Sequence, residues 1–360
     1  MKWIECTLGD ILNFRRGYDL PHSEMSGGDI PVAGSNGVIG YHNKATDISP
    51  VITIGRSGNV GTPYIYDRAW AHNTTLFIDD FKGNDPLYLY YLIKTLPLAS
   101  FGGGSAVPTL NRNHIHPLIV KHCPDVEEQK RIASFLNAFD EKIELNKRIN
   151  HNLEDFLLSL YGRLLDSQCG SSTIGQVSER VYSGGTPDTK NSDYWGGTIN
   201  WLSSGETSNH FIIDTEKRIT ENGVLHSSTK FASKYDVVIA SAGQGNTRGQ
   251  TSMTLLDTCI NQSVIVIHAN TYEAPIVFCS LANRYDELRA ISDASSIRGS
   301  LTTKMISALE IPVFPEVETF KFASQAKCII DQVENNLREN RSLTMMRDSL
   351  LPKLMRGGLS

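Results

Sequence analysis

The sequence predicts a mixed α/β fold in two copies, separated by two long helices that form an antiparallel coiled coil with a pseudo-twofold internal repeat. Short segments recur far along the chain: residues 7–11 (TLGDI) return as 173–177 (TIGQV), and residues 142–153 return as 332–343 with five of twelve positions identical. Repeats at such offsets indicate that one structural unit occurs twice. The stretches between the repeated segments share little else, so two similar frames enclose dissimilar globular parts.

Each repeat ends in a stretch whose apolar residues alternate spacings of four and three, which is the pattern of a coiled-coil seam. The first seam runs through Ile132, Leu136, Phe139, Ile143, Asn146, Asn150, Leu153, Leu157, Leu160 and Leu164. The second runs through Phe322, Ala326, Ile329, Val333, Asn336, Asn340, Leu343, Arg347, Leu350 and Leu354, and Arg347 is its one clear break. A proline precedes each stretch and a glycine follows it, as at helix boundaries. We therefore expect helices over residues 124–168 and 316–360.

Four asparagines in these seams indicate how the helices pair. A polar Asn at a seam position costs stability and fixes the register. Antiparallel pairing would bring Asn146 close to Asn340 and Asn150 close to Asn336, so we expect this orientation. About 37 residues of helix extend roughly 55 Å, which is more than one turn of DNA at about 34 Å. The alternative is two unrelated surface helices that expose their asparagines.

The globular stretches combine strand and helix patterns. Apolar runs at residues 51–54 and 237–240 predict buried strands, and each leads into a glycine-rich loop. The next strands are expected at 76–78 and 264–267. Short helices are expected at 86–96 and 274–288.

Charge limits the ways in which this chain could bind nucleic acid. The formal net charge is −5, whereas a free-standing nucleic-acid binder usually has a basic surplus. The first 123 residues hold 10 Lys and Arg against 10 Asp and Glu. If the chain binds DNA, it must therefore place few cations deliberately or share phosphate neutralisation with a partner.

The cysteine pattern and the hydropathy favour a cytoplasmic protein. The six cysteines are scattered without a CxxC motif, which is typical of reduced thiols. No window approaches the roughly 18 apolar residues of a membrane span. The first residues lack the apolar core of a signal peptide, so we expect none.

Catalytic motifs are poorly represented. The glycine-rich segment 55–61 lacks the Lys-Ser/Thr ending of a phosphate-binding loop, so a turn or a backbone-hugging loop explains it better. Segments 85–88 and 101–104 resemble amino-methyltransferase motifs only faintly. Asp125 and Glu128 lie at the start of a predicted helix, where capping explains them better than a nuclease site. We expect no catalytic residue in this chain.

A metal site is not expected either. The best metal-like cluster consists of His114, His116, His122 and Cys123. A structural zinc site needs about four ligands in a closed arrangement, and no second cluster completes one.

Polar residues suited to DNA recognition gather in corresponding loops of both halves. Arg can read guanine and Asn or Gln can read adenine through paired hydrogen bonds, while Ser, Thr and Lys hold phosphates. In the first half the candidate DNA-binding residues are Arg15, Arg16, Tyr18, Ser35, Asn36, Arg56, Ser57, Asn59, Asn111 and Arg112. In the second half they are Thr186, Lys190, Tyr194, Trp195, Ser203, Ser204, Gln244, Asn246, Arg248, Arg298, Ser300 and Lys304. A solvated loop explains any one of them equally well, but their clustering in matching loops favours recognition.

Several of these segments resemble a known family, the specificity subunits of type I restriction-modification systems. Residues 183–187 (SGGTP), with 194–201 (YWGGTINW), resemble the beginning of a target-recognition domain in that family. Residues 142–146 (KIELN) and 350–355 (LLPKLM) resemble its helix motifs. The resemblance covers the whole chain, although residues 16–19 (RGYD) depart from the Gly-Gly-Thr-Pro form.

This resemblance implies a division of labour. The two target-recognition domains, at 1–123 and 169–315, would each read one half of a bipartite asymmetric target in double-stranded DNA. A central helix would follow the first domain at 124–168, and a C-terminal helix would follow the second at 316–360. The coiled coil would set the unread gap. Two modification (methyltransferase) subunits would bring S-adenosylmethionine, and restriction (translocase and endonuclease) subunits would bring ATP and Mg. The chain itself would hold no cofactor and catalyse no reaction.

Two other classes of function remain open. One is the recognition subunit of a related system in which a single partner both methylates and cuts DNA. The other is a coiled-coil adaptor that binds proteins, for which no salt-dependent DNA affinity is expected. A stand-alone enzyme ranks third, because no catalytic site is evident.

Overall fold

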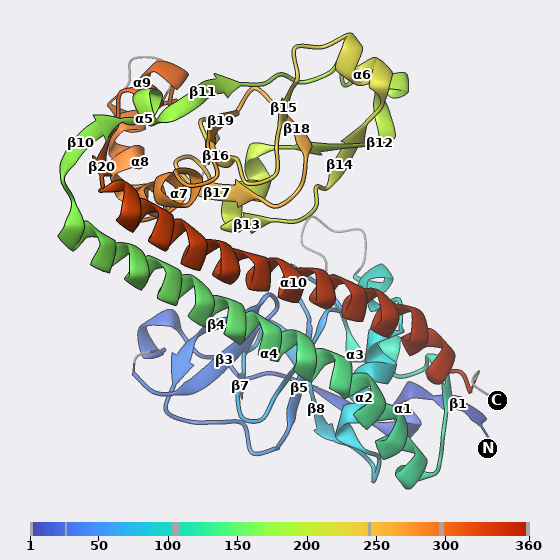
Figure 1. The fold of residues 1–360 in the computed structure, drawn as a ribbon. Helices are drawn as coiled ribbons and strands as arrows, with labels where there is room; N and C mark the ends of the chain where they lie inside the picture. The colour runs from blue at the N-terminus through green and yellow to red at the C-terminus, as the bar shows by residue number, and fades with distance from the viewer. Residues whose placement is uncertain (1–2, 26, 103–108, 244–245, 295–298, 358–360) are drawn as a thin grey trace. The chain divides into compact units, whose positions relative to one another are not determined.

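The computed structural model describes residues 3–25, 27–102, 109–243, 246–294 and 299–357. The chain divides into two compact units, one formed by residues 1–143 with 341–360 and the other by residues 144–340. We call them unit 1 and unit 2. Both boundaries fall inside long helices, α4 (Val126–Leu164) and α10 (Glu316–Leu354), so each unit contains one α/β body and a piece of each helix (Figure 1).

Unit 1 is built on short strands that are antiparallel except for one parallel pair. Its strands are β1 (Ile4–Thr7), β2 (Asn13–Arg16), β3 (Ile30–Gly34), β4 (Gly37–His42), β5 (Val51–Gly55), β6 (Pro63–Tyr66), β7 (Trp70–Ala71), β8 (Thr75–Asp80) and β9 (Ile119–His122). Its shorter helices are α1 (Leu8–Ile11), η1 (His22–Glu24), α2 (Pro86–Lys94), η2 (Leu98–Phe101) and α3 (Arg112–Ile115). The sheets have the orders β2-β8-β5-β6 and β4-β3-β7, the parallel pair is β3 with β7, and β1 pairs with β9.

The core of unit 1 joins its main sheet to the long helices. Strand β5 is buried along its whole length, as expected for an apolar run without polar alternation. Asp85 caps the N-terminus of helix α2, because its side chain accepts a hydrogen bond from the Tyr88 backbone N–H at 2.8 Å, and the helix buries Tyr88 and Tyr91. These rings pack in one cluster with Leu136 of α4 and Leu351 of α10.

Unit 2 has larger sheets. Its strands are β10 (Gly170–Thr173), β11 (Ser178–Ser183), β12 (Trp195–Leu202), β13 (Phe211–Ile212), β14 (Lys217–Ile219), β15 (Lys230–Ala232), β16 (Val237–Ala240), β17 (Thr251–Thr254), β18 (Thr258–Ile260), β19 (Val264–Ala269) and β20 (Glu310–Val313). Its shorter helices are η3 (Leu165–Ser167), α5 (Ile174–Val177), η4 (Ser192–Tyr194), η5 (Ser204–Ser208), α6 (Glu221–Leu225), α7 (Ala274–Ala282), α8 (Tyr285–Asp293) and α9 (Thr303–Ser307). The sheets have the orders β11-β19-β16-β17-β13 and β14-β12-β18-β15, and β10 pairs with β20.

One face of the larger sheet in unit 2 packs on the long helices through α7. Val237 and Ile239 of β16 share a cluster with Val277 of α7, Tyr161 of α4 and Phe322 of α10. The opposite face, including Val238, packs against the second sheet in a separate cluster. The alternation of neighbours along β16 follows from the period of two in a strand.

The two units begin and end alike. In unit 1 the strand at the N-terminus pairs with the last strand before α4, and in unit 2 β10 pairs with the last strand before α10. Thr7 and Thr173 each begin a short helix with a capping box, completed by Asp10 and Gln176 respectively. The recurring residues 7–11 and 173–177 therefore form the same local structure.

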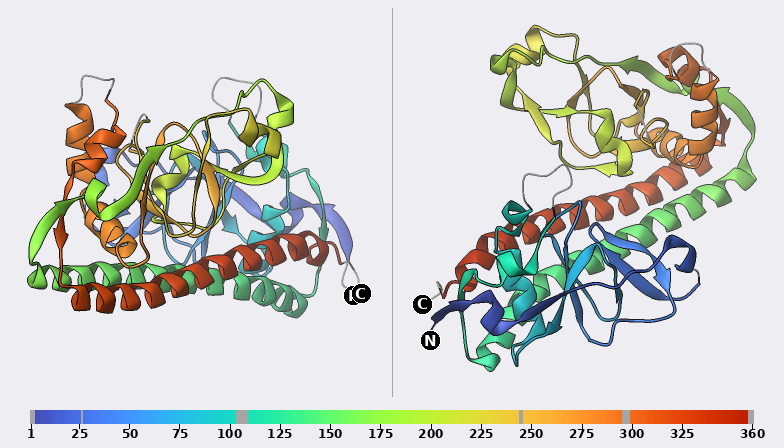
Figure 2. Two further views of the ribbon diagram at one scale, coloured as in Figure 1. Left: turned by 45° about the horizontal axis from the view of Figure 1, so that its top comes forward. Right: turned by 180° about the vertical axis from the view of Figure 1, so that it is seen from behind.

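The long helices contact each other through asparagines within unit 2. Asn146 Nδ2 donates to Asn340 Oδ1 at 2.9 Å, and Asn336 Nδ2 donates to Asn150 Oδ1 at 2.7 Å. Both expected pairs are therefore present, and numbers that rise along α4 fall along α10, so these pieces run antiparallel. Both views in Figure 2 show them side by side.

We expect Asn150→Ala to lower the unfolding free energy of unit 2 by about 1–3 kcal/mol. The substitution leaves the buried Asn336 Nδ2 without its acceptor, and an unsatisfied buried donor carries its full desolvation cost. The double variant Asn150→Leu/Asn336→Leu should be neutral or more stable, because both polar groups are gone. Urea denaturation, followed by hydrogen exchange of unit 2 peptides, measures the stability of the single and the double variant. A double variant as unstable as Asn150→Ala would contradict this account.

Arg347, the break in the second seam, has a partner within unit 1. Its guanidinium binds Asp140 of α4, and Asp140 Oδ2 also accepts a hydrogen bond from the Tyr91 hydroxyl at 2.6 Å. Burial alone would lower the pKa of Arg347, but the hydrogen bonds to Asp140 and Asp348 outweigh it and raise the pKa. Burial followed by the hydrogen bond to Asp140 raises the pKa of Tyr91. The break is thus a charged contact between the helices.

Most element positions predicted from sequence agree with the structure. The strands expected at 51–54, 76–78, 237–240 and 264–267 are β5, β8, β16 and β19. The helix expected at 274–288 is wrong as one element, because α7 ends at Ala282 and α8 begins at Tyr285. Each long helix ends earlier than predicted, at Leu164 and Leu354. In the described residues, no helix is long and apolar enough to cross a membrane.

Candidate nucleic-acid interface

Four arginines of unit 1 meet around one pocket. The pocket has a volume of about 390 Å³. It is lined by Arg15, Arg16, Arg56, Leu76, Thr109, Leu110, Asn111 and Arg112. Five of the residues proposed from sequence for DNA binding are therefore brought together from three separate segments. Thr109 was missed, because its bridge to Ser57 joins residues far apart in the sequence and leaves no local signal.

The walls of this pocket are held by backbone hydrogen bonds. Arg56 follows β5, and its N–H donates to Thr74 O at 2.8 Å while its carbonyl accepts from Leu110 N at 2.8 Å. The next residue, Ser57, forms an isolated β-bridge with Thr109. The Arg56 backbone is therefore fixed on both sides, by the turn before β8 and by the segment before α3.

Glycine allows the loop after β5 to fold this tightly. A Cβ at Gly55 would lie 1.7 Å from the carbonyl oxygen of Asn59, which no side chain tolerates. The side-chain Oδ1 of Asn59 accepts a hydrogen bond from Thr62 Oγ1 at 3.1 Å. The glycine-rich segment 55–61 is therefore a compact turn, in agreement with the interpretation made from sequence.

The four guanidinium groups differ in how they are occupied. Arg112 Nη1 donates to the carbonyl of Phe14 at 3.2 Å. Arg15 lies 5.4 Å from the centre of the Tyr18 ring, and Arg16 makes an exposed ion pair with Asp19 at 3.5 Å. Among the described residues, the guanidinium of Arg56 has neither a hydrogen bond nor an ion pair.

The pocket concentrates positive charge in a segment that has no excess of it. Four of the five arginines in the first 123 residues line the pocket, and its described lining contains no acidic residue. Clustered cations attract the phosphates of nucleic acid, and arginine also reads guanine edges. The few arginines of this segment thus lie together. The charge balance of the chain led us to expect such a grouping if the chain binds DNA.

Asn111 contributes to the pocket mainly by beginning a helix. Its side chain accepts a hydrogen bond from the Asn113 backbone N–H at 3.0 Å and so caps α3. Reading adenine would need both the amide oxygen and the amide nitrogen. Because its oxygen is engaged, Asn111 is better suited to donate to a phosphate or a base acceptor.

The remaining candidates of unit 1 lie outside the pocket lining. The Ser35 hydroxyl is buried and donates to Thr74 O at 3.0 Å. Tyr18 packs on Trp70 with ring centres 5.3 Å apart, which positions the ring beneath Arg15. Asn36, beyond the end of β3, is exposed. DNA contacts by these residues stay predictions.

Three histidines of unit 1 are kept neutral by their surroundings. Burial is the first cause that lowers the pKa of His72, His116 and His122 from the ordinary value of 6.5. His116 Nε2 accepts a hydrogen bond from the Phe14 backbone N–H at 3.1 Å, which requires an unprotonated nitrogen. This contact ties the segment before β9 to β2, one wall of the arginine pocket.

We expect unit 1 to lose stability as the pH falls from 7.5 to 5.5. Each lowered pKa means that the unfolded chain binds a proton more readily, so the stabilisation is complete above about 6.5 and is lost as the pH falls through the folded value. Hydrogen exchange of unit 1 peptides at both pH values measures the change. His116→Gln keeps an acceptor for Phe14 and should flatten the dependence, whereas His114→Gln, at an exposed position, should not. A stability of unit 1 that does not vary with pH would contradict the expectation.

Several candidates of unit 2 are engaged within their own domain. The guanidinium of Arg248 binds the Gly299 carbonyl and Asp293, and only 13% of its side chain is exposed. Trp195 Nε1 donates to Asp188 O at 3.1 Å, and the Thr186 hydroxyl donates to Gln262. These contacts hold the domain together, and DNA binding by the same side chains stays a prediction.

The other candidates of unit 2 divide into loop and capping positions. Ser203 forms a capping box with Glu206, and the carbonyl of Ser204 accepts from the Thr207 hydroxyl at 2.8 Å. Tyr194 stacks on His226. Lys190, Asn246 and Lys304 are exposed, and Ser300 is half-buried. Gln244 and Arg298 lie outside the described residues.

A second polar pocket lies beside the glycine-rich loop of unit 2. It has a volume of about 390 Å³, and its lining includes Asn246, Gln250, Thr251 and Tyr285. In the described part of the chain, Gln250 Oε1 and Thr251 Oγ1 are buried without a hydrogen-bond partner. The sequence reasoning missed both residues, although Gln250 stands only two positions after Arg248.

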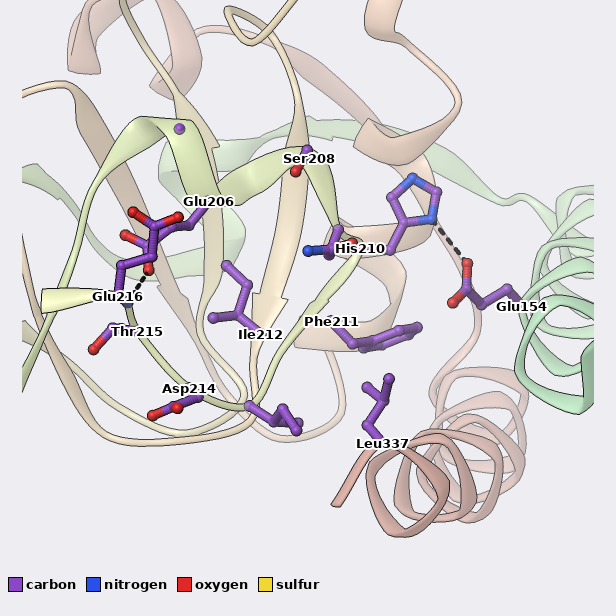
Figure 3. A pocket seen from close by; sticks show the side chains of 13 residues that line it. Glu154, Glu206, Ser208, His210, Phe211, Ile212, Asp214, Thr215, Glu216 and Leu337 are labelled. Carbon is purple, nitrogen blue, oxygen red and sulfur yellow. Dashed lines mark hydrogen bonds and ion pairs between the residues drawn. The ribbon is translucent and has the colours of Figure 1, made fainter. Parts of the chain in front are cut away.

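A larger pocket of unit 2, about 700 Å³, is acidic (Figure 3). Glu206, Asp214 and Glu216 line it, and Glu154 of α4 pairs there with His210 at 3.2 Å. Leu337 of α10 lies near Phe211 across its apolar side. These carboxylates repel phosphate, so this pocket is not a surface for DNA.

The four residues of the metal-like cluster have other surroundings. His116 accepts from Phe14, and the buried Cys123 N–H donates to the Tyr88 hydroxyl at 3.1 Å. His114 is exposed, while His122 is buried. Within the described ranges, no three His, Cys, Asp or Glu side chains are placed to hold a metal ion.

Comparison with known proteins matches the first part of the chain to a protein family. Residues 1–155, which contain the arginine pocket, match the family of the type I restriction modification DNA specificity domain. This first part of the chain is thus similar to a DNA specificity domain. The resemblance drawn from the sequence motifs is thereby confirmed.

Similar proteins match most of the length of this chain. A type I restriction enzyme specificity subunit of Escherichia coli is 25% identical over 310 residues, covering 79% of this chain and 75% of the relative. A putative type I specificity subunit of Mycoplasma pneumoniae is 23% identical over 382 residues, covering 98% and 96%.

A solved structure shares the fold. The S subunit of a type I restriction-modification system from M. genitalium has a TM-score of 0.67 at 17% identity, covering 98% of this chain and 96% of that one. The mixed α/β fold with a long C-terminal helix is therefore shared with a specificity subunit.

Proposed function

We propose that this chain is the DNA specificity subunit of a type I restriction-modification complex and reads the two halves of a bipartite asymmetric target. One observation carries the proposal: four arginines converge on one pocket inside the part of the chain that matches a DNA specificity domain. Phosphate contacts position such a subunit and base contacts specify the sequence. We assign residues 1–123 and 169–315 to the two target-recognition domains.

The long helices are proposed to form an antiparallel coiled coil that sets the unread gap of the target. The two asparagine pairs within unit 2 and the Asp140–Arg347 contact within unit 1 support this pairing. Polar contacts at seam positions select register and orientation. The matching first and last strands of the two units support an internal repeat.

The same helices are proposed to dock two modification subunits, with restriction subunits joining the complex. Large apolar side chains of the helices are exposed, which is typical of protein-binding surfaces. On α4 they are Phe135, Leu145, Ile149 and Phe156, and on α10 Val317, Phe320, Met345 and Met346. S-adenosylmethionine, ATP and Mg would belong to these partners, and this chain would recognise DNA in the cytoplasm without catalysing a reaction.

The test is a map of methylated bases. We would co-express the chain with its cognate modification subunit and determine the methylated positions of the host genome by long-read sequencing. A two-part motif with a fixed gap is expected. A complex that assembles without producing such a motif would refute the proposal and favour the protein-binding adaptor.

Shortening both helices by seven residues tests the spacer role. Seven residues of helix extend about 10.5 Å, close to the rise of 3 base pairs. We expect the gap of the methylated motif to shorten by about that number, or methylation to stop, while both half-sites keep their bases wherever methylation persists. An unchanged gap with full methylation would refute the spacer role.

A further inference from the structure

We propose that Arg56 reads a guanine in the half-site recognised by unit 1, while Arg15, Arg16 and Arg112 hold the flanking phosphates. This inference rests on the proposed function and deepens it by assigning separate roles to the side chains of one pocket. It depends on three features of Arg56: its free guanidinium, its fixed backbone and its depth in the pocket.

The first feature is the absence of a competing partner. Among the described residues, Arg56 is the pocket arginine whose guanidinium has neither a hydrogen bond, an ion pair nor an aromatic contact. Reading guanine needs two parallel N–H donors aimed at O6 and N7. Arg112 already donates to Phe14 O, and Arg16 pairs with Asp19.

The second feature is a backbone held from two sides. Hydrogen bonds at 2.8 Å join Arg56 N to Thr74 O and Leu110 N to Arg56 O. A base contact is specific only when the direction of the side chain is fixed, whereas a phosphate tolerates many approaches. Arg15 and Arg16 lie in β2, which is the edge strand of its sheet and pairs on one side only, with β8, and their side chains are exposed.

The third feature is depth. Arg56 is half-buried, while Arg15, Arg16 and Arg112 are exposed around it. Exposed cations meet the DNA backbone, and a recessed donor between them can meet a base edge lying between the strands. The arrangement thus matches one base contact flanked by phosphate contacts.

The experiment compares Arg56→Lys with the unaltered chain in the assembled methyltransferase complex. Lysine keeps the charge and loses the two-pronged guanidinium. We expect the genomic methylation map to show relaxed selection at a single G·C position of one half-site, by about ten- to a hundredfold. The other half-site and the gap should stay as they were, which also shows that the variant folds and assembles.

Arg16→Ala and Arg68→Ala are the matched controls. Arg16→Ala should weaken methylation evenly across all sites without changing the motif, because a phosphate contact carries no sequence information. Arg68 is the remaining arginine of the first 123 residues, it is exposed and does not line the pocket, and its variant should behave as the unaltered chain.

Three results would overturn the assignment while leaving the proposed function intact. In the first, the Arg56→Lys variant methylates the same bipartite motif as the unaltered chain. In the second, Arg56→Lys weakens methylation evenly at all positions of the motif. In the third, the half-site read by unit 1 contains no G·C pair. Exchange of residues 1–123 for those of a relative with another target identifies that half-site. The absence of any bipartite motif with the unaltered chain would instead refute the proposed function.

Discussion

Replacing Arg15, Arg16 and Arg112 together with alanine is expected to lower the DNA affinity of the assembled complex by roughly a hundredfold to a thousandfold at 0.1 M salt. Each phosphate contact contributes about 0.9 to the slope of log affinity against log salt, which amounts to nearly tenfold at this salt concentration. The slope of log affinity against log salt is negative, and it should become less steep by about 3 when the three contacts are lost. Fluorescence anisotropy with a labelled duplex over a range of salt concentrations measures both quantities.

Two further variants separate charge at the pocket from charge in general. The triple lysine variant at the same positions keeps the phosphate contacts and should retain most of the affinity. Lys44→Ala/Arg68→Ala/Lys121→Ala removes the same charge from exposed positions of unit 1 outside the pocket and should have little effect. Equal losses in the two alanine triples would show that the pocket is not the contact surface.

Asp140→Ala is expected to lower the unfolding free energy of unit 1 by about 2–3 kcal/mol. The substitution leaves the Arg347 guanidinium, whose side chain is 16% exposed, without Asp140, and it removes the acceptor of the Tyr91 hydroxyl. Breaking a fully buried pair costs more, about 3–5 kcal/mol, and partial exposure of this pair reduces the loss. Hydrogen exchange of unit 1 peptides distinguishes this loss from any change in unit 2.

Controls for Asp140 lie next to it and across from it. Glu141→Ala, at an exposed neighbouring position, should change stability by less than about 0.5 kcal/mol. In a double-mutant cycle, Asp140→Ala and Arg347→Ala should show a coupling energy of at least about 1 kcal/mol. Additive effects of the two substitutions would mean that the contact does not stabilise the unit.

The sequence predicted the elements with strong periodicity well. The spacing of the seam residues located both long helices to within a few residues. The buried strands were found because apolar runs of about four residues are too short for a helix and are typical of strands. The error at 274–288 has a local cause: an apolar helix and an amphipathic helix follow each other, and the break at Asn283 and Arg284 carries neither Gly nor Pro.

The site was predicted as a set of residues but not as a shape. Arg15, Arg56 and Arg112 lie in separate segments, and only the antiparallel sheet with the Leu110–Arg56 hydrogen bond brings them together. By contrast, Arg248 lies in a matching loop of the second half, but its guanidinium is bound to Asp293 and to the Gly299 carbonyl. Loop position therefore suggests a DNA contact, whereas partner groups decide whether the side chain is available.

The sequence by itself determined the two long helices, their asparagine pairs and the resemblance to specificity subunits. These features are set by spacing along one helix or by contiguous motifs, which are local properties. Only the tertiary structure decided that four arginines share one pocket, that Arg347 pairs with Asp140, and that Arg56 alone among those arginines is left without a partner in the described chain. Each of these depends on contacts between residues far apart in sequence, whose geometry is fixed by packing of the sheets and helices rather than by local pattern.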